Sequence, residues 1–209
     1  FNTVFENCFL ITSSPLIPSN RIQGKLQNIK LVKNRPSSIS NLFQQGKLFH
    51  TAVESLLLAK EIAAKEQEDD TGVSGYVRSV KHVIREVTGV RALESAVQHE
   101  ALGYRGLVDC VAEYRGSLCL IDWKTSEKPK PFLQSTFDSP LQVVAYAGAL
   151  NHDKNYDFQV NCGLVVIAYK DGSPAHSHYM DSALCDLYWD KWLLRLEEYR
   201  EKEKEARAE

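Results

Sequence analysis

Apolar residues recur at intervals of three and four positions in three stretches of the chain, and this period predicts amphipathic helices. The predicted helices cover residues 40–61, about 71–89, and the chain from about 181 onward. Gly89 is expected to end the second helix, because glycine commonly follows the last helical turn. A further helix is expected to begin at Asp138 or Ser139, since either side chain is a good N-cap and Pro140 suits the first turn.

Alternating and continuous apolar runs predict five strands. They cover residues 91–101, 104–114, 117–125, 158–170 and 175–180. Arg115 and Gly116 separate the second strand from the third, which predicts a tight hairpin turn. The predicted order is two helices, three strands, a helix, two strands and a final helix. This order predicts an α/β fold class with a mixed β-sheet flanked by helices.

Composition excludes several classes of protein. The 209 residues carry a formal net charge of −2, so the chain lacks the strongly basic character of a protein that coats duplex nucleic acid. No run of 18 apolar residues is present, and we expect no membrane association. The five cysteines form no Cys-x-x-Cys pair, which argues against a zinc site or a disulfide framework.

The charge is unevenly distributed along the chain. Residues 1–53 carry six bases and one acid, and the first 40 residues are rich in Ser, Asn and Pro. This composition is typical of an organelle transit peptide, and it also fits a loose N-terminal arm. We therefore predict an atypical or transit-like arm over residues 1–39, a main domain over 40–200 and a charged helix end over 201–209.

Charged residues converge on the predicted hairpin. Residues two apart in a strand share a face, so Asp122 and Lys124 point to the same side of the sheet. Pairing across the turn at Arg115 and Gly116 places Asp109 opposite Asp122. Two carboxylates this close repel each other unless a cation lies between them, and Mg²⁺ or Mn²⁺ prefers such oxygen ligands. The residues alone leave two interpretations open: a divalent metal site, or a surface Asp–Lys pair beside a second aspartate.

Three segments resemble the motifs of the PD-(D/E)xK nuclease superfamily. They read Gly-Leu-Val-Asp at 106–109, Ile-Asp-Trp-Lys at 121–124 and Gln-Val-Val-Ala-Tyr at 142–146. A Gln-x-x-x-Tyr helix is typical of the RecB-type branch. The resemblance extends from residue 40 to about 199 and includes ALESAVQHE, DCVAEY, IDWKTSEKPKPF and PLQVVAYAGAL. It implies that the main domain is a RecB-type nuclease domain with a restriction-endonuclease-like core.

The resemblance also implies roles for matching residues. The implied metal ligands for Mg²⁺ or Mn²⁺ are His50, Asp109 and Asp122, and these residues together with Lys124 are the implied catalytic residues. Gln142 and Tyr146, one helical turn apart, match a substrate-binding pair. From the residues alone, His50 also fits a core or solvent-facing position, and Tyr146 also fits the core. Glu94 matches an acid on the first strand only loosely. The scattered cysteines do not provide the iron–sulfur cluster that some relatives carry.

A loop after the hairpin suits contact with a nucleic-acid strand. Lys128 and Lys130 alternate with prolines and precede Phe132. Lysines follow phosphates and an aromatic ring stacks on a base, so these three residues are candidate substrate contacts. An ordinary solvated loop explains the same residues.

Within the RecB-type branch, the chain resembles mitochondrial exonucleases of vertebrates. This resemblance implies a metal-dependent exonuclease that degrades single-stranded DNA from free ends and processes flaps during mitochondrial DNA replication. The implied location is the mitochondrial matrix, and the implied partners are single-stranded DNA and the mitochondrial replication machinery; we expect a monomer. Two alternatives stay open: a duplex DNA endonuclease of the same superfamily, and a non-catalytic nucleic-acid-binding module on this fold.

Overall fold

The computed structural model describes residues 10–11, 37–62 and 73–208. The helices are α1 (Ser37–Ile62), α2 (Ser74–Glu86), η1 (a 3-10 helix, Leu133–Thr136), α3 (Ser139–His152) and α4 (Ser182–Ala208). The strands are β1 (Leu10–Ile11), β2 (Val87–His99), β3 (Tyr104–Tyr114), β4 (Ser117–Ser126), β5 (Cys162–Tyr169) and β6 (His176–Met180). Apart from β1 and η1, the elements follow the predicted order. Most of the predicted arm over residues 1–39 lies outside the described residues.

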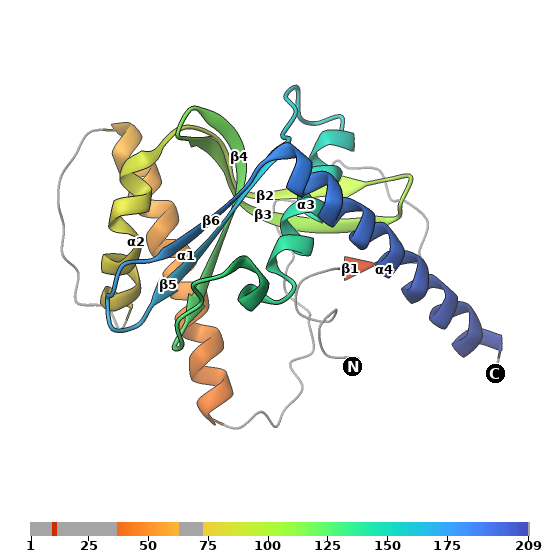
Figure 1. The fold of residues 1–209 in the computed structure, drawn as a ribbon, viewed down its shortest axis with the longest axis horizontal. Coiled ribbons are helices and arrows are strands. Elements are labelled where there is room, and N and C mark those ends of the chain that lie inside the picture. The colour runs from red at the N-terminus through yellow and green to blue at the C-terminus, as the bar shows by residue number, and fades with distance from the viewer. Residues whose placement is uncertain (1–9, 12–36, 63–72, 209) are drawn as a thin grey trace, which may run out of the picture.

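One mixed sheet organises the fold and confirms the predicted α/β class. Its strands lie in the order β1-β3-β4-β5-β6, and β2 also pairs with β3. β4 and β5 are parallel, whereas the other neighbours are antiparallel. A parallel pair requires a crossover connection, which α3 provides. α1 and α2 cover one face of the sheet, while α3 and α4 cover the other (Figure 1).

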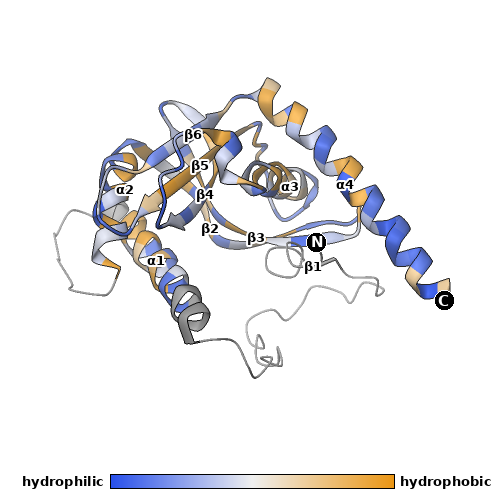
Figure 2. Ribbon diagram, turned by 60° about the horizontal axis from the view of Figure 1, so that its bottom comes forward, coloured by the Kyte–Doolittle hydropathy of each residue, from blue (hydrophilic) through white to orange (hydrophobic). Residues whose placement is uncertain are grey.

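Each face of the sheet has its own apolar core. On one face, Phe49 and Val53 of α1 pack with Val80 of α2 against Trp123 of β4. On the other face, α3 is buried along most of its length against the sheet and α4. The C-terminal part of α4 is hydrophilic along its length (Figure 2). No helix among the described residues is long and apolar enough to cross a membrane.

The sheet divides where β3 and β4 part. Their register runs from Tyr114–Ser117 to Cys110–Ile121, as the predicted hairpin requires. Beyond Cys110, β3 continues beside β2, whereas β4 continues beside β5 (Figure 1). We call the point of division, at residues 109 and 122, the fork.

The predicted boundary between the second helix and the first main strand is wrong. α2 ends at Glu86, and the chain is already extended at Val87, because Val87 and Thr88 are β-branched residues that favour strands. Gly89 has a φ of +56° inside β2, where the register with β3 shifts between Thr88 and Ala92. Its left-handed conformation belongs to a β-bulge, not to a helix end.

The start of α3 also differs from the expected cap. Asp138 occupies the N-cap position, but its side chain makes no capping hydrogen bond among the described residues. Its carboxylate instead accepts a hydrogen bond from Arg195 of α4 at 2.7 Å. Asp138 therefore ties α3 to α4.

The strand predicted over residues 158–170 is shorter in the structure, where β5 covers only Cys162–Tyr169.

Candidate active site

Asp109 lies where the ladder between β3 and β4 ends. Its carboxylate accepts the backbone N–H of Trp123 at 2.9 Å, so a side chain replaces the next ladder bond. Asp122, directly before Trp123, is only 2% exposed. The hairpin thus brings both aspartates to the fork, as its register predicts.

Helix α1 and strand β2 bring two further side chains to Asp109. His50 follows Phe49, which is fully buried in the core. The side chain of His50 therefore lies at the margin of this core, next to the fork. Nδ1 of His50 lies 3.5 Å from Oδ1 of Asp109 and 3.7 Å from Oε1 of Glu94. Each of these three residues offers one potential ligand atom, and the three atoms lie within 4.8 Å of one another. We call His50, Glu94 and Asp109 the donor cluster.

The backbone is irregular at Glu94. Its φ is +41°, a left-handed value that residues other than glycine seldom adopt. The register between β2 and β3 passes from Leu93–Cys110 directly to Ser95–Val108. This distortion of β2 accompanies the placement of Glu94 beside Asp109, and strained residues of this kind concentrate at functional sites.

Burial and the negative charge of Asp122 disfavour the ionised form of Asp109 at the fork. Burial and, after it, the nearby charge of Asp122 raise the pKa of Asp109 to about 6, against the lowering influence of His50 and Lys124. Burial alone would lower the pKa of His50, but its interaction with Glu94 and the charge of Asp109 raise that pKa above its ordinary value. The donor cluster therefore brings together carboxylates whose mutual repulsion a bound cation would offset.

A chain of hydrogen bonds extends from Asp122 to α3. The ammonium of Lys124 donates to Oδ1 of Asp122 at 2.8 Å and to Oε1 of Gln142 at 2.9 Å. The amide of Gln142 in turn donates to the hydroxyl of Tyr146 at 3.1 Å. Gln142 and Tyr146 are both buried. We call Asp122, Lys124, Gln142 and Tyr146 the lysine chain.

Gly106 lets Tyr146 occupy its position. A Cβ atom at Gly106 would lie 2.2 Å from Cε1 of the Tyr146 ring, closer than side-chain carbons approach. The glycine of the Gly-Leu-Val-Asp segment therefore makes room on β3 for the far end of the lysine chain.

The donor set suits a hard divalent cation. Oδ2 of Asp122 is buried and has no hydrogen-bond partner within the part of the chain that the structure describes. An orphaned buried carboxylate oxygen costs free energy unless a cation or an ordered water contacts it. Two carboxylates of the donor cluster and the histidine face the same point, which is the oxygen-rich environment that Mg²⁺ or Mn²⁺ prefers. The residues present therefore fit a divalent metal.

Two of the three candidate contacts of the loop are exposed. Lys128 is exposed, and Phe132 is 68% exposed. Lys130 is half-buried, and its ammonium lies over the ring of Phe137, 4.1 Å from the ring centroid.

The sequence indicates Glu94 only weakly and does not indicate the exposed position of Phe137. Glu94 lies opposite Asp109 in the register shared by the flanking pairs Leu93–Cys110 and Ser95–Val108, a register that no two-residue turn signal marks in the sequence. Phe137 stands alone between Thr136 and Asp138, and nothing in its neighbours distinguishes it from a core residue.

A mixed sheet with two carboxylates and a lysine where two strands part fits the class of metal-dependent nucleases. The chain belongs to the PD-(D/E)XK nuclease superfamily, whose family model matches residues 25–208. Mitochondrial genome maintenance exonuclease 1 of Homo sapiens is 68% identical over 165 residues, covering 79% of this chain and 48% of that protein. The protein of the same name from Mus musculus is 63% identical over 169 residues, covering 81% of this chain and 49% of the relative. The Xenopus tropicalis protein of that name is 63% identical over 164 residues, covering 78% and 47%. The chain thus spans about half the length of these curated relatives.

Proposed function

We propose that this chain is a metal-dependent exonuclease that hydrolyses single-stranded DNA from free ends in mitochondrial DNA maintenance. The observation that carries the proposal is the fork, where the donor cluster and the lysine chain meet. Membership of the nuclease superfamily and the names of the relatives support the same reading.

The proposed metal ligands are His50, Glu94, Asp109 and Asp122. A divalent cation held there would supply Lewis-acid stabilisation of the phosphate and activation of the attacking water. The backbone N–H of Trp123 holds the Asp109 carboxylate in place, so the ligand is oriented in advance.

Lys124 would stabilise the negative charge that develops on the phosphate during hydrolysis. Its ammonium is anchored by Asp122 and Gln142, so little reorganisation is needed when the charge appears. Gln142 and Tyr146 are buried and bonded toward Lys124, so we propose that they position this lysine; a direct contact with the substrate is the role that the sequence predicted for them.

We propose that the strand reaches the fork past the loop of Lys128, Lys130 and Phe132. Two lysines and an exposed aromatic ring provide phosphate and base contacts without a broad basic face. Such local contacts suit one strand threaded from its end, including the flaps formed during replication.

The proposed setting is the mitochondrial matrix, with the replication machinery as partner. The word mitochondrial in the relatives' names supports the compartment. The proposed state is a monomer, in which the donor cluster and the lysine chain are complete without residues from a second copy.

The test compares labelled DNA substrates in Mg²⁺, Mn²⁺ and excess EDTA. We expect the linear single strand to be degraded with either metal and to persist in EDTA. A circular single strand of the same sequence should resist, because threading requires an end. A blunt duplex should also resist, because unpairing costs on the order of 1–2 kcal/mol per step. Cleavage in excess EDTA would refute the metal site, and efficient cutting of the circle would favour an endonuclease.

A further inference from the structure

Phe137 is an exposed aromatic residue in an uncommon backbone conformation. Its side chain is 78% exposed, the largest exposed fraction among the described large apolar residues. Its φ of +57° lies in the left-handed region, which bulky residues seldom adopt. Strained residues are found most often at functional sites. A phenylalanine that is both strained and solvent-exposed gains nothing from core packing, so its position calls for another explanation.

A fixed lysine covers one side of the Phe137 ring. The ammonium of Lys130 lies 4.1 Å from the ring centroid, well within the range of a cation–π interaction. The backbone of Lys130 is held on both sides, since its N–H donates to the hydroxyl of Tyr169 at 2.8 Å and its carbonyl contacts Nε2 of His178 at 2.9 Å. The lysine is therefore presented by a rigid loop, and the ring and the charge form one preorganised unit.

This unit lies on the segment that connects the two halves of the lysine chain. The segment starts after β4, which carries Lys124, and ends at α3, which carries Gln142. Phe137 lies two residues before α3 begins and five residues before Gln142, so the ring and the α3 partner of Lys124 are close along the chain.

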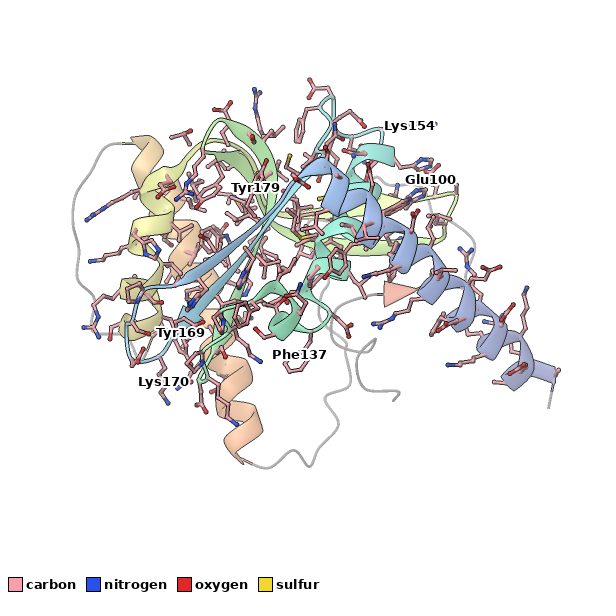
Figure 3. The ribbon with its side chains drawn as sticks, in the orientation of Figure 1. Glu100, Phe137, Lys154, Tyr169, Lys170 and Tyr179 are labelled. Atoms are coloured by element: carbon pink, nitrogen blue, oxygen red, sulfur yellow. The ribbon has the colours of Figure 1, made fainter. Side chains whose placement is uncertain are left out.

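Space for a strand is present on the same edge of the molecule. A cavity of about 630 Å³ lies beside the loop, and the residues that line it include Pro129 and Tyr169, the base Lys170, and the acids Glu127 and Asp171. Phe137, Tyr169 and Lys170 all lie in the lower half of the view in Figure 3. The hydroxyl of Tyr169, which lines the cavity, accepts the N–H of Lys130, and Lys130 covers the Phe137 ring, so the cavity, the lysine and the exposed ring are contiguous.

We propose that Phe137 and Lys130 form a base-stacking subsite for the single strand whose phosphate reaches the fork. The ring offers its surface to a nucleobase, and Lys130 strengthens the stack and neutralises the adjacent phosphate. Any base has a flat π-surface, so this subsite selects unpaired nucleotides without selecting sequence. The inference rests on the function proposed above and adds a residue that selects single strands.

The test measures binding of the full chain to a fluorescent oligothymidylate in Ca²⁺, with a single abasic position moved along the strand. In the unmodified protein, one abasic position should weaken binding between about fivefold and a hundredfold, the value of one stacked base. In Phe137→Leu, which keeps an apolar side chain, intact and abasic strands should bind equally at that position. Phe137→Trp should restore the discrimination. Tyr179→Leu is the matched control, because Tyr179 is an exposed aromatic at the opposite end of β6 from His176.

A second measurement isolates the charge. Lys130→Gln should reduce the slope of log affinity against log salt by about 0.7, the value for one phosphate contact on a single strand. Lys154→Gln is the control, since Lys154 is exposed and lies far from Phe137 in Figure 3. Equal discrimination in Phe137→Leu and the unmodified protein would overturn the subsite, as would a loss of discrimination in Phe132→Leu alone. Failure of the proposed function gives a different result, namely no metal-dependent hydrolysis by the unmodified protein.

Discussion

The donor cluster and the lysine chain meet at the fork but are built in opposite ways. In the donor cluster, the side chains of His50, Glu94 and Asp109 lie 3.5 and 3.7 Å apart and are all partly exposed. In the lysine chain, successive polar atoms are joined at 2.8, 2.9 and 3.1 Å, and every member except Lys124 is buried. One region leaves room between its ligands, whereas the other is closed.

The difference follows from what each region has to do. A cluster that receives a cation must keep its oxygens close together before the cation arrives, so it carries like-charge repulsion. A chain that orients a lysine works best when its rotamers are locked by packing and hydrogen bonds. We therefore expect substitutions in the donor cluster to remove activity without loss of stability, and substitutions in the lysine chain to lower both.

The largest effect is expected from Asp109→Asn. The rate of hydrolysis of a single strand should fall by more than about a hundredfold. Loss of a residue that only hydrogen-bonds to a metal ligand costs about ten- to a hundredfold, and loss of the ligand itself should cost more. The free energy of unfolding should stay the same or rise, because the amide oxygen still accepts the N–H of Trp123 and a charge near Asp122 is gone. Turnover with a Mg²⁺ titration and urea unfolding without metal measure the two quantities.

Glu113→Gln is the matched control for that substitution. Glu113 is an exposed carboxylate on the same strand, beside the hairpin turn. It should leave both turnover and stability unchanged. A clear loss of stability in Asp109→Asn would break the comparison between the two regions, since it would show that the donor cluster holds the fold together.

A smaller loss of activity, now with a loss of stability, is expected from Gln142→Leu. The change removes the acceptor for Lys124 and the donor for Tyr146, and an orphaned buried polar group costs about 1–3 kcal/mol. The maximum rate should fall about ten- to a hundredfold while the affinity for a single strand stays the same. Weaker strand binding at an unchanged rate would instead identify Gln142 as a substrate contact. Tyr146→Phe should have a milder effect in the same direction.

Gly106→Ala tests the far end of the lysine chain without removing a polar group. The new Cβ would lie 2.2 Å from the Tyr146 ring, and overpacking of this kind costs about 1–3 kcal/mol. Displacing Tyr146 should also lower the rate, by less than Gln142→Leu does. In Gly46→Ala, by contrast, the new Cβ meets no described atom within 4 Å on helix α1, and this variant should gain about 0.5–1 kcal/mol. Unfolding free energies and rates of both variants decide whether the close approach matters.

The sequence predicts the hairpin half of this site well and the rest less well. The turn at Arg115 and Gly116 fixes the register, so Asp109 and Asp122 could be placed together from residue numbers alone. The bond from Lys124 to Gln142 links a strand to a later helix, and only the packing of α3 on the sheet creates it. The position of Glu94 depends on the register of β2 against β3, which no tight turn signal marks in the sequence.

Gly89 shows a related limit. A helix end and a β-bulge both need a residue with positive φ, so glycine marks the position without identifying the structure. The β-branched Val87 and Thr88 were the available signal that the helix had already ended.

The smallest effect concerns the strand that carries Glu94. His99 lies at the end of β2, where its ring stacks on His152 of α3 with centroids 4.1 Å apart, and its Nδ1 accepts the N–H of Leu102. Burial, followed by the charge of His152, lowers the pKa of His99 to about 4 from an ordinary value of 6.5. Between these pH values the unfolded chain binds the proton more readily, so the free energy of unfolding should fall as the pH drops from 6.5 toward 4. Above pH 6.5, His99 should contribute no pH dependence.

Urea unfolding at pH 7, 5.5 and 4.5 should therefore show a smaller decline of the free energy of unfolding in His99→Phe than in the unmodified protein. His152→Gln should also reduce the decline, because the charge facing His99 is gone. If the free energy of unfolding of both variants declines as steeply as that of the unmodified protein, groups other than His99 set the stability in acid. Strand β2, which carries Glu94, is then no more sensitive to pH than strand β4, which carries Lys124.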